Sequence, residues 1–86
     1  MEKFQAFDQA VFAEGAIPVK YKQLMAITAA HITQCPFCID AHTRAAQKAG
    51  ASDAEIAEAV FVAMAMRAGG SMSHGAIAMR IAHDHG

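Results

Sequence analysis

Gln34-Cys35-Pro36-Phe37-Cys38-Ile39-Asp40-Ala41-His42 is the stretch around which we interpret the rest of the chain. It contains both cysteines of the protein, separated by two residues, and a histidine four residues after the second. Proline suits the first position of a helix, where its missing N–H leaves no hydrogen bond unmade, and it keeps the preceding residue out of the helical region. The sequence therefore predicts a helix over residues 36–48, with Cys35 at its N-cap and Gly50 in a left-handed conformation after its end.

The reactive side chains of this helix are predicted to share one face. At 100° per residue, Cys38 and His42 lie about 60° and about 20° around the helix axis from Cys35. The Cα atoms of the two cysteines would be about 5 Å apart, within the range of an unstrained disulfide. Free N–H groups at the helix start favour a thiolate, and an imidazole one turn after Cys38 favours a general base. This arrangement predicts a dithiol redox site.

The composition predicts one small domain over residues 1–86 that assembles with other copies of itself. Hydrophobic residues make up 55% of the chain, more than a core of this size can cover, so we expect the excess apolar surface between subunits. The net charge is −1 and the basic residues are scattered, so no nucleic-acid partner is expected. The chain has neither a signal-peptide pattern nor an apolar run of membrane-spanning length, which predicts a cytoplasmic protein without a membrane partner.

Hydrophobic spacing predicts an all-α fold of about five helices. The first covers Glu2 to about Glu14 and is closed by Gly15, and the second covers about Val19–Thr33. Small alanines along the second helix would let neighbouring helices approach closely. The cysteine helix is the third. No alternation typical of a β-strand is present.

The fourth predicted helix begins with a capping box, in which Ser52 is the N-cap and Glu55 stands three residues later. After Glu58 it is apolar on nearly all sides, which predicts burial all round and again favours subunit packing. Gly69-Gly70-Ser71 is expected to break it, and a fifth helix is expected from Ser71 to about Ala82. The tail His83–Gly86 is expected to be frayed.

A Cys-x-x-Cys pair also occurs in haem, thioredoxin-like and zinc sites. A c-type haem needs histidine directly after the second cysteine, where Ile39 stands, and thioredoxin-like sites follow a strand. A structural zinc site needs four ligands. Candidates are Cys35, Cys38 and His42, with His31 or His74 as the fourth. The cysteines could also be inert core residues. The compact one-face geometry favours a disulfide, so no metal ion and no cofactor is expected.

Three further polar residues have both a structural and a functional interpretation. His31 lies four residues before the first cysteine and either bonds carbonyls at the end of its helix or belongs to the site. His74 is either a wall of the site or unrelated to it. Glu14 is an unfavourable charge at the end of a helix, which makes it a weak candidate for another role. The six methionines have the spacing of core residues.

Four runs of the sequence together resemble the AhpD-like alkylhydroperoxidase branch of the carboxymuconolactone decarboxylase family, over roughly residues 5–80. These runs are Leu24-Met25-Ala26-Ile27-Thr28-Ala29-Ala30, Cys35-x-x-Cys38-x-x-x-His42, Ala45-x-x-x-Ala49-Gly50-Ala51-Ser52 and Glu55-Ile56-x-Glu58-Ala59. The decarboxylase branch usually lacks the cysteine pair, so the resemblance implies thiol chemistry and not lactone decarboxylation. It also implies an orthogonal bundle of helices that assembles as trimers or hexamers.

The resemblance further implies the role of each site residue. Cys38 would attack a hydroperoxide, Cys35 would resolve the product to a disulfide, and His42 would relay the proton. An external dithiol, either a lipoyl group or a partner reductase, would then reduce the disulfide. The alternatives are a dithiol–disulfide reductase or adaptor with little peroxidase activity, and a non-enzymatic helical oligomer that binds zinc or an apolar ligand.

Two residues depart from the family pattern. Gln23 stands where the family usually has a glutamate of the proton relay, and Phe37 stands where AhpD has a histidine. A glutamine can orient a water molecule but cannot accept a proton. The relay is therefore predicted to use other groups, for which the candidates are His31, Glu14 and His74, with Gln23 in an orienting role.

Overall fold

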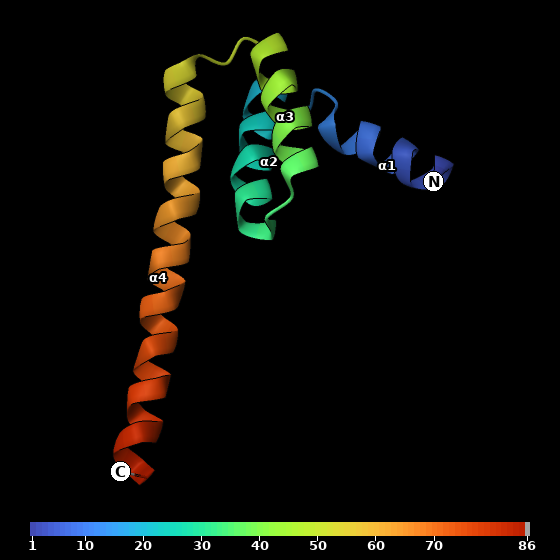
Figure 1. Cartoon of the computed structure of the whole chain (residues 1–86). Coiled ribbons are helices and arrows are strands. Elements are labelled where there is room, and N and C mark those ends of the chain that lie inside the picture. Colours follow the sequence, from blue (N-terminus) through green and yellow to red (C-terminus); the bar gives the residue numbers. More distant parts are fainter. Residues whose placement is uncertain (86) are drawn as a thin grey trace.

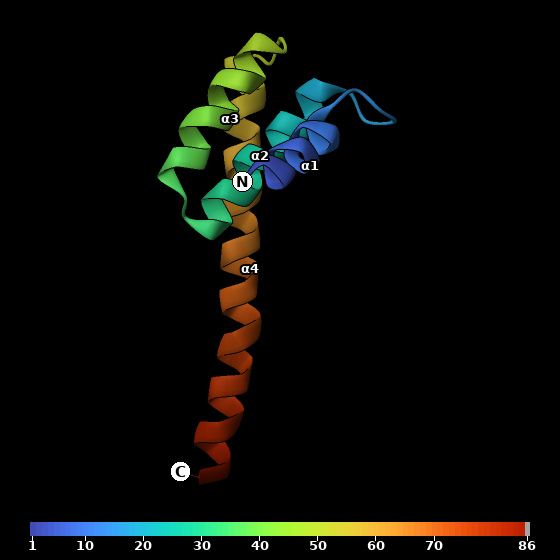
Figure 2. The same cartoon turned by 90° about the vertical axis from the view of Figure 1, so that its right-hand side faces the viewer.

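The computed structural model describes residues 1–85 and contains four helices (Figure 1). They are α1 (Glu2–Phe12), α2 (Val19–Thr33), α3 (Pro36–Lys48) and α4 (Asp53–His85). The chain is all-α, as predicted, because residues 1–85 contain no strand. Helices α2, α3 and the first half of α4 pack together, while α1 and the second half of α4 project away from them (Figures 1 and 2). None of the described helices is both long and apolar enough to cross a bilayer.

Both ends of α3 form as the sequence predicts. Cys35 is the N-cap in an extended conformation, and Pro36 is the first helical residue. At the other end Gly50 has a φ of +95°, in the left-handed region that favours glycine. Two hydrogen bonds of a Schellman motif then close the helix: Gly50 N–H to Gln47 O (3.0 Å) and Ala51 N–H to Ala46 O (2.9 Å).

A tight turn at Gln34 folds α3 back along α2. Gln34 has φ 59° and ψ 51°, and within residues 1–85 it is the one non-glycine residue with positive φ. The Cys35 N–H bonds to Ala30 O at 3.1 Å, which closes the turn. The two helices then meet at Ile27 and Ala46, both of which are fully buried. This contact is the centre of the small core.

Helix α4 joins the core through Ala59 and is held to α2 by polar contacts. The Thr28 hydroxyl donates to Ala59 O at 2.9 Å, and Arg67 donates to Ile32 O at 3.2 Å. The arginine thereby places a positive charge at the C-terminal end of α2, where the helix dipole favours it. These bonds fix the first half of α4 beside α2.

The predicted capping box at the start of α4 is confirmed. The Ser52 N–H donates to Glu55 at 2.9 Å, and the Glu55 N–H donates to the Ser52 hydroxyl at 3.1 Å. Glu55 also pairs with Lys20 of α2 at 3.1 Å. The backbone N–H of Ser52 and the Lys20 ammonium hold the pKa of the Glu55 carboxyl below its ordinary value of 4.5. Because the pKa of Glu55 is lowered in the folded state, its ionised carboxylate stabilises the fold at neutral pH. This contribution to the free energy of unfolding is lost as pH falls through the folded-state pKa.

The predicted break at Gly69-Gly70-Ser71 and the separate fifth helix are wrong, because α4 runs without interruption to His85. A glycine costs about 1 kcal/mol relative to alanine inside a helix, but it keeps its N–H and causes no clash. Proline would have removed a hydrogen bond, and α4 contains none. The frayed tail is likewise not observed through His85, and Gly86 lies outside the described residues. Helix α1 ends at Phe12, two residues earlier than expected.

The single chain leaves an unusually large apolar surface uncovered. Its accessible surface is 6485 Å², whereas a compact monomer of 9.1 kDa would expose about 4,900 Å². The radius of gyration is 17.2 Å, against about 12 Å for a compact domain of this length. The fourth helix is therefore not buried all round within one chain. Its exposed large apolar residues are Phe61, Val62, Met64, Met66, Met72, Ile77, Met79 and Ile81.

A glycine-to-alanine pair tests the continuity of α4. A Cβ at Gly69 would meet no atom within 4 Å, so Gly69→Ala should raise the free energy of unfolding by about 0.5–1 kcal/mol and increase helicity. Gly50→Ala should lower it by about 1 kcal/mol or more, because residue 50 has positive φ. Thermal unfolding followed by far-UV circular dichroism measures both. A stability loss at Gly69 as large as that at Gly50 would contradict the continuous helix.

Candidate active site at the start of α3

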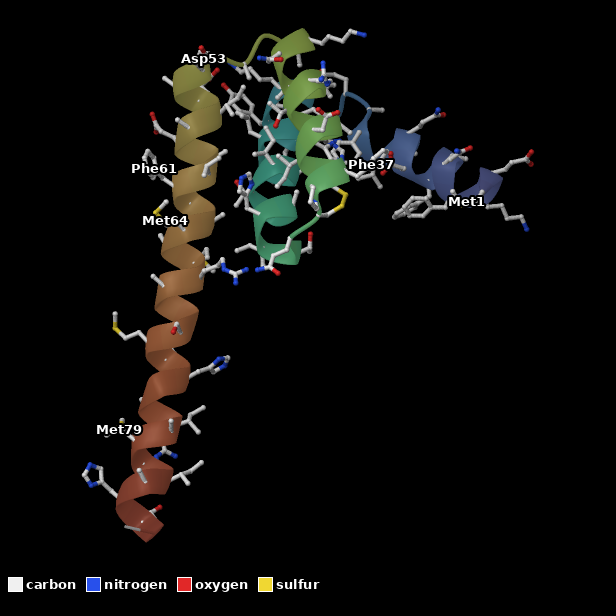
Figure 3. The ribbon with its side chains drawn as sticks, viewed as in Figure 1. Met1, Phe37, Asp53, Phe61, Met64 and Met79 are labelled. Carbon is white, nitrogen blue, oxygen red and sulfur yellow. A yellow bond between two sulfur atoms is a disulfide. The ribbon has the colours of Figure 1, made fainter. Side chains whose placement is uncertain are left out.

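The two cysteines form a disulfide across the first turn of α3 (Figure 3). Their Cα atoms are 5.2 Å apart, as helical spacing predicts. The backbone N–H of Cys38 points to the Cys35 sulfur at 3.2 Å, so the N-cap side chain accepts a hydrogen bond from the helix. Both cysteines are half-buried. The pair can therefore exchange between dithiol and disulfide on one rigid turn.

The His42 ring is held by a hydrogen bond to Gln23, a residue of α2. The His42 Nδ1 lies 2.7 Å from the Gln23 side-chain oxygen. An amide oxygen only accepts hydrogen bonds, so Nδ1 carries the proton and donates it. Nε2 is then the ring nitrogen left to exchange a proton. Gln23 is 8% exposed and is the one buried polar residue of the described chain, which makes this bond well protected from water.

The face of the His42 ring is covered by Phe12, the last residue of α1. The two ring centroids are 5.0 Å apart and the ring planes differ by 26°, which is a stacked arrangement. The backbone of α3, the amide of Gln23 and the ring of Phe12 thus constrain the imidazole from three directions. These contacts come from three different helices.

A pocket of about 250 Å³ opens beside Cys38 and His42. Cys35 does not line it. The remaining wall consists of Phe12 from α1 and four small residues of α2, namely Ala26, Ala29, Ala30 and Thr33. The small side chains predicted to allow close helix packing therefore also leave space next to one of the two sulfurs.

The other predicted relay residues lie outside this pocket. The Glu14 carboxylate accepts a hydrogen bond from the Val19 N–H at 3.3 Å, at the start of α2. His31 donates from Nδ1 to the Ile27 carbonyl at 2.8 Å, within its own helix. His74 is exposed on the projecting part of α4. Within one chain, the structure brings together Cys35, Cys38, His42 and Gln23 and leaves these three apart from them.

No metal-binding arrangement supports the zinc alternative in the described chain. Residues 1–85 contain no group of three or more His, Cys, Asp or Glu side chains placed to hold an ion.

Phe37, which lies between the cysteines, is 81% exposed and points away from the core (Figure 3). The exposed ring of Phe37 thus stands between the two cysteines in the sequence, and the pocket reaches Cys38 alone.

Two contacts near the site, made by Phe12 and Lys22, could not be predicted from the sequence. Phe12 had the spacing of an ordinary apolar residue of α1, and its contact with His42 joins positions 30 residues apart. Lys22 bonds the end of α1, at Val11 O (2.8 Å) and Ala13 O (2.7 Å). A local pattern could not reveal either contact, because both depend on the direction in which α1 leaves α2.

Comparison with known proteins agrees with this architecture. The model of the family described as "Carboxymuconolactone decarboxylase family" matches residues 1–80. The chain belongs to this family. The resemblance predicted from the sequence is thereby confirmed at family level, and the family includes AhpD-like proteins.

Two proteins, one of known sequence and one of known structure, are similar to this member of the carboxymuconolactone decarboxylase family. A protein of Paracoccus denitrificans named "Uncharacterized protein 4 in cox locus" is 45% identical over 73 residues, which is 85% of this chain. The chain spans 66% of that relative, just under two thirds of its length. A crystal structure of a protein from Methanobacterium thermoautotrophicum aligns with a TM-score of 0.81 at 33% identity, over 87% of this chain and 84% of that one.

Gln23→Leu tests the role of the buried amide. It should leave the His42 N–H unpaired and lower the free energy of unfolding by about 1–3 kcal/mol. Nitrogen NMR of the imidazole should change from one tautomer, with the proton on Nδ1, to a mixture. Gln47→Leu, on the exposed side of α3, is the matched control. It should change neither the free energy of unfolding nor the His42 nitrogen spectrum. An unaltered His42 spectrum in Gln23→Leu would contradict the hydrogen bond.

Proposed function

We propose that this protein is an AhpD-like thiol oxidoreductase that reduces hydroperoxides through a dithiol–disulfide cycle. The observation that carries the proposal is that Cys38 and His42 line one pocket, from which Cys35 is excluded, while Cys35 lies within bonding distance of Cys38. This arrangement supports Cys38 as the nucleophile, Cys35 as the resolving thiol and His42 as the proton carrier, all within the first two turns of α3. Family membership supports the same chemistry.

The reaction begins with the reduced site. The Cys38 thiolate attacks the terminal oxygen of a hydroperoxide, so that an S–O bond forms and the O–O bond breaks. His42 Nε2, which has taken the proton of the Cys38 thiol, passes it to the departing alkoxide, so the alcohol leaves and Cys38 becomes a sulfenic acid. The Cys35 thiol then gives up its proton as its sulfur attacks the Cys38 sulfur. The S–S bond forms, the S–O bond breaks, and the hydroxide leaves with that proton as water. Each cycle transfers two electrons from the dithiol to the peroxide.

An external dithiol completes the cycle. A lipoyl group or the thiols of a partner reductase would attack the Cys35–Cys38 disulfide and leave as a disulfide themselves. The exposed ring of Phe37 borders the sulfurs and would be the first apolar group that such a partner meets. Reduction of this kind belongs to a reducing compartment, which supports a cytoplasmic location.

Gln23 favours a second candidate function, a dithiol–disulfide reductase or adaptor with little peroxidase activity. The amide fixes His42 in one tautomer but cannot itself accept a proton, so the relay stops at the imidazole. Thiol–disulfide exchange makes a smaller demand on proton delivery than cleavage of an O–O bond. Stopped-flow oxidation of the reduced protein by cumene hydroperoxide and by a disulfide-bonded protein separates the two. Faster reaction with the disulfide would favour the adaptor.

Serine variants test the assignment of the attacking sulfur. Cys38→Ser should abolish hydroperoxide consumption, because a serine hydroxyl is not ionised at neutral pH. Cys35→Ser, the matched control, should still react once per chain and accumulate a sulfenic acid that a dimedone probe traps. Peroxide consumption measured for the two variants distinguishes the attacking cysteine from the resolving cysteine. Wild-type turnover in Cys38→Ser would show that Cys38 is not the nucleophile.

We also propose that the working form is a homo-oligomer, a trimer or a hexamer as in AhpD-like relatives. The excess apolar surface on α4 supports this, since most of the stability of a helix in a protein comes from packing of its apolar face. Light scattering should give a mass that is a multiple of 9.1 kDa. Ile77→Lys should shift the mass toward a single chain, whereas Gln47→Lys on α3 should not. A wild-type mass of one chain would contradict the proposal.

A further inference from the structure

The junction between α1 and α2 is fastened by a lysine. The Lys22 ammonium donates to two carbonyls at the end of α1, Val11 O at 2.8 Å and Ala13 O at 2.7 Å. The last carbonyls of a helix have no partners within it, and a cation there is favoured by the helix dipole. Helix α1 has no basic residue in its own last turn. Lys22 therefore supplies, from α2, the C-terminal cap that α1 lacks.

A second bond fastens the other end of the same connection. The Glu14 carboxylate accepts the backbone N–H of Val19, the first residue of α2. The start of the segment between the helices is thus tied to α2 twice, through Lys22 and through Val19. Helix α1 has no buried residue of its own, so these polar bonds contribute much of what sets its direction. Figure 1 shows α1 projecting away from α2 beyond this junction.

Phe12 is positioned by this junction. It lies between the two residues whose carbonyls Lys22 binds, and its ring stacks on His42 at 5.0 Å. The second side-chain torsion of histidine is broad and roughly two-fold, so the ring plane is fixed only by outside contacts. Gln23 fixes one edge of the imidazole, and Phe12 fixes its face.

We propose that Lys22 is a positioning residue of the active site. By binding the end of α1 it holds Phe12 on His42 and thereby fixes the imidazole in the pocket beside Cys38. Its effect on peroxide reduction rests on the proposed function, whereas the placement of the ring does not. Lys22 does not line the pocket with Cys38, so it acts through Phe12 and not on the substrate.

The test compares Lys22→Met, Phe12→Leu and the double variant with the wild type. The ring current of Phe12 shifts the proton NMR signals of the His42 ring, and the difference between wild type and Phe12→Leu measures this shift. The shift should also be lost in Lys22→Met. Oxidation of the reduced protein by cumene hydroperoxide should slow roughly tenfold in each single variant. The double variant should be no slower than the singles, because both changes break the same contact.

Two further variants exclude a general effect of charge or folding. Lys22→Arg, which can donate to the same carbonyls, should restore the NMR shift and the rate. Lys3→Met, in the exposed first turn of α1, removes an equal charge and should behave as wild type. If Lys22→Met fails to fold, the Lys22→Arg spectrum decides, since loss of the shift there would overturn the proposal.

The proposal and the proposed function fail in different ways. A wild-type shift in Lys22→Met, or additive losses in the double variant, would overturn the positioning role even if peroxide is consumed normally. No peroxide consumption by the reduced wild type, together with the expected NMR changes, would overturn the peroxidase function and leave the positioning role intact.

Discussion

The packing of α3 against α2 around Ile27 and Ala46 is the contact on which the rest of this structure depends. Both side chains are fully buried, and the turn at Gln34 holds the helices close enough for them to meet. Gln23 lies one turn before Ile27 and His42 one turn before Ala46, so their hydrogen bond depends on this contact. The core is small, and each of its few members is therefore important for both stability and site geometry.

The site separates two tasks that a carboxylate would combine. A glutamate beside His42 could both orient the imidazole and exchange a proton with it, whereas Gln23 can only orient it. Proton movement is then left to the pocket side of the ring, next to Cys38. The chemistry of the dithiol is unaffected by this change, because the disulfide geometry depends on the first turn of α3 alone. Under the proposed function, we therefore expect Gln23 to affect how quickly the sulfurs react more than whether they can react.

Much of the apolar surface of α4 is left uncovered within one chain. The second half of α4 extends past the other helices (Figure 1), and its large apolar side chains are exposed. Such a helix gains little from propensity alone, especially with Gly69, Gly70 and Gly75 in it, and needs a surface to cover it. The active site, by contrast, is assembled within one chain from α1, α2 and α3. The surface proposed for assembly and the candidate active site therefore lie in different parts of the fold.

The local features of this protein follow from short-range sequence patterns. Cys35 at the N-cap, the left-handed Gly50 and the Ser52–Glu55 capping box are set by neighbouring residues, so they could be predicted correctly. Only the tertiary structure decided that α4 continues through Gly69, because glycine raises the cost of a helix without forbidding it. It likewise decided that Phe12 covers His42. That contact joins distant parts of the chain and depends on helix directions, which local sequence patterns do not encode.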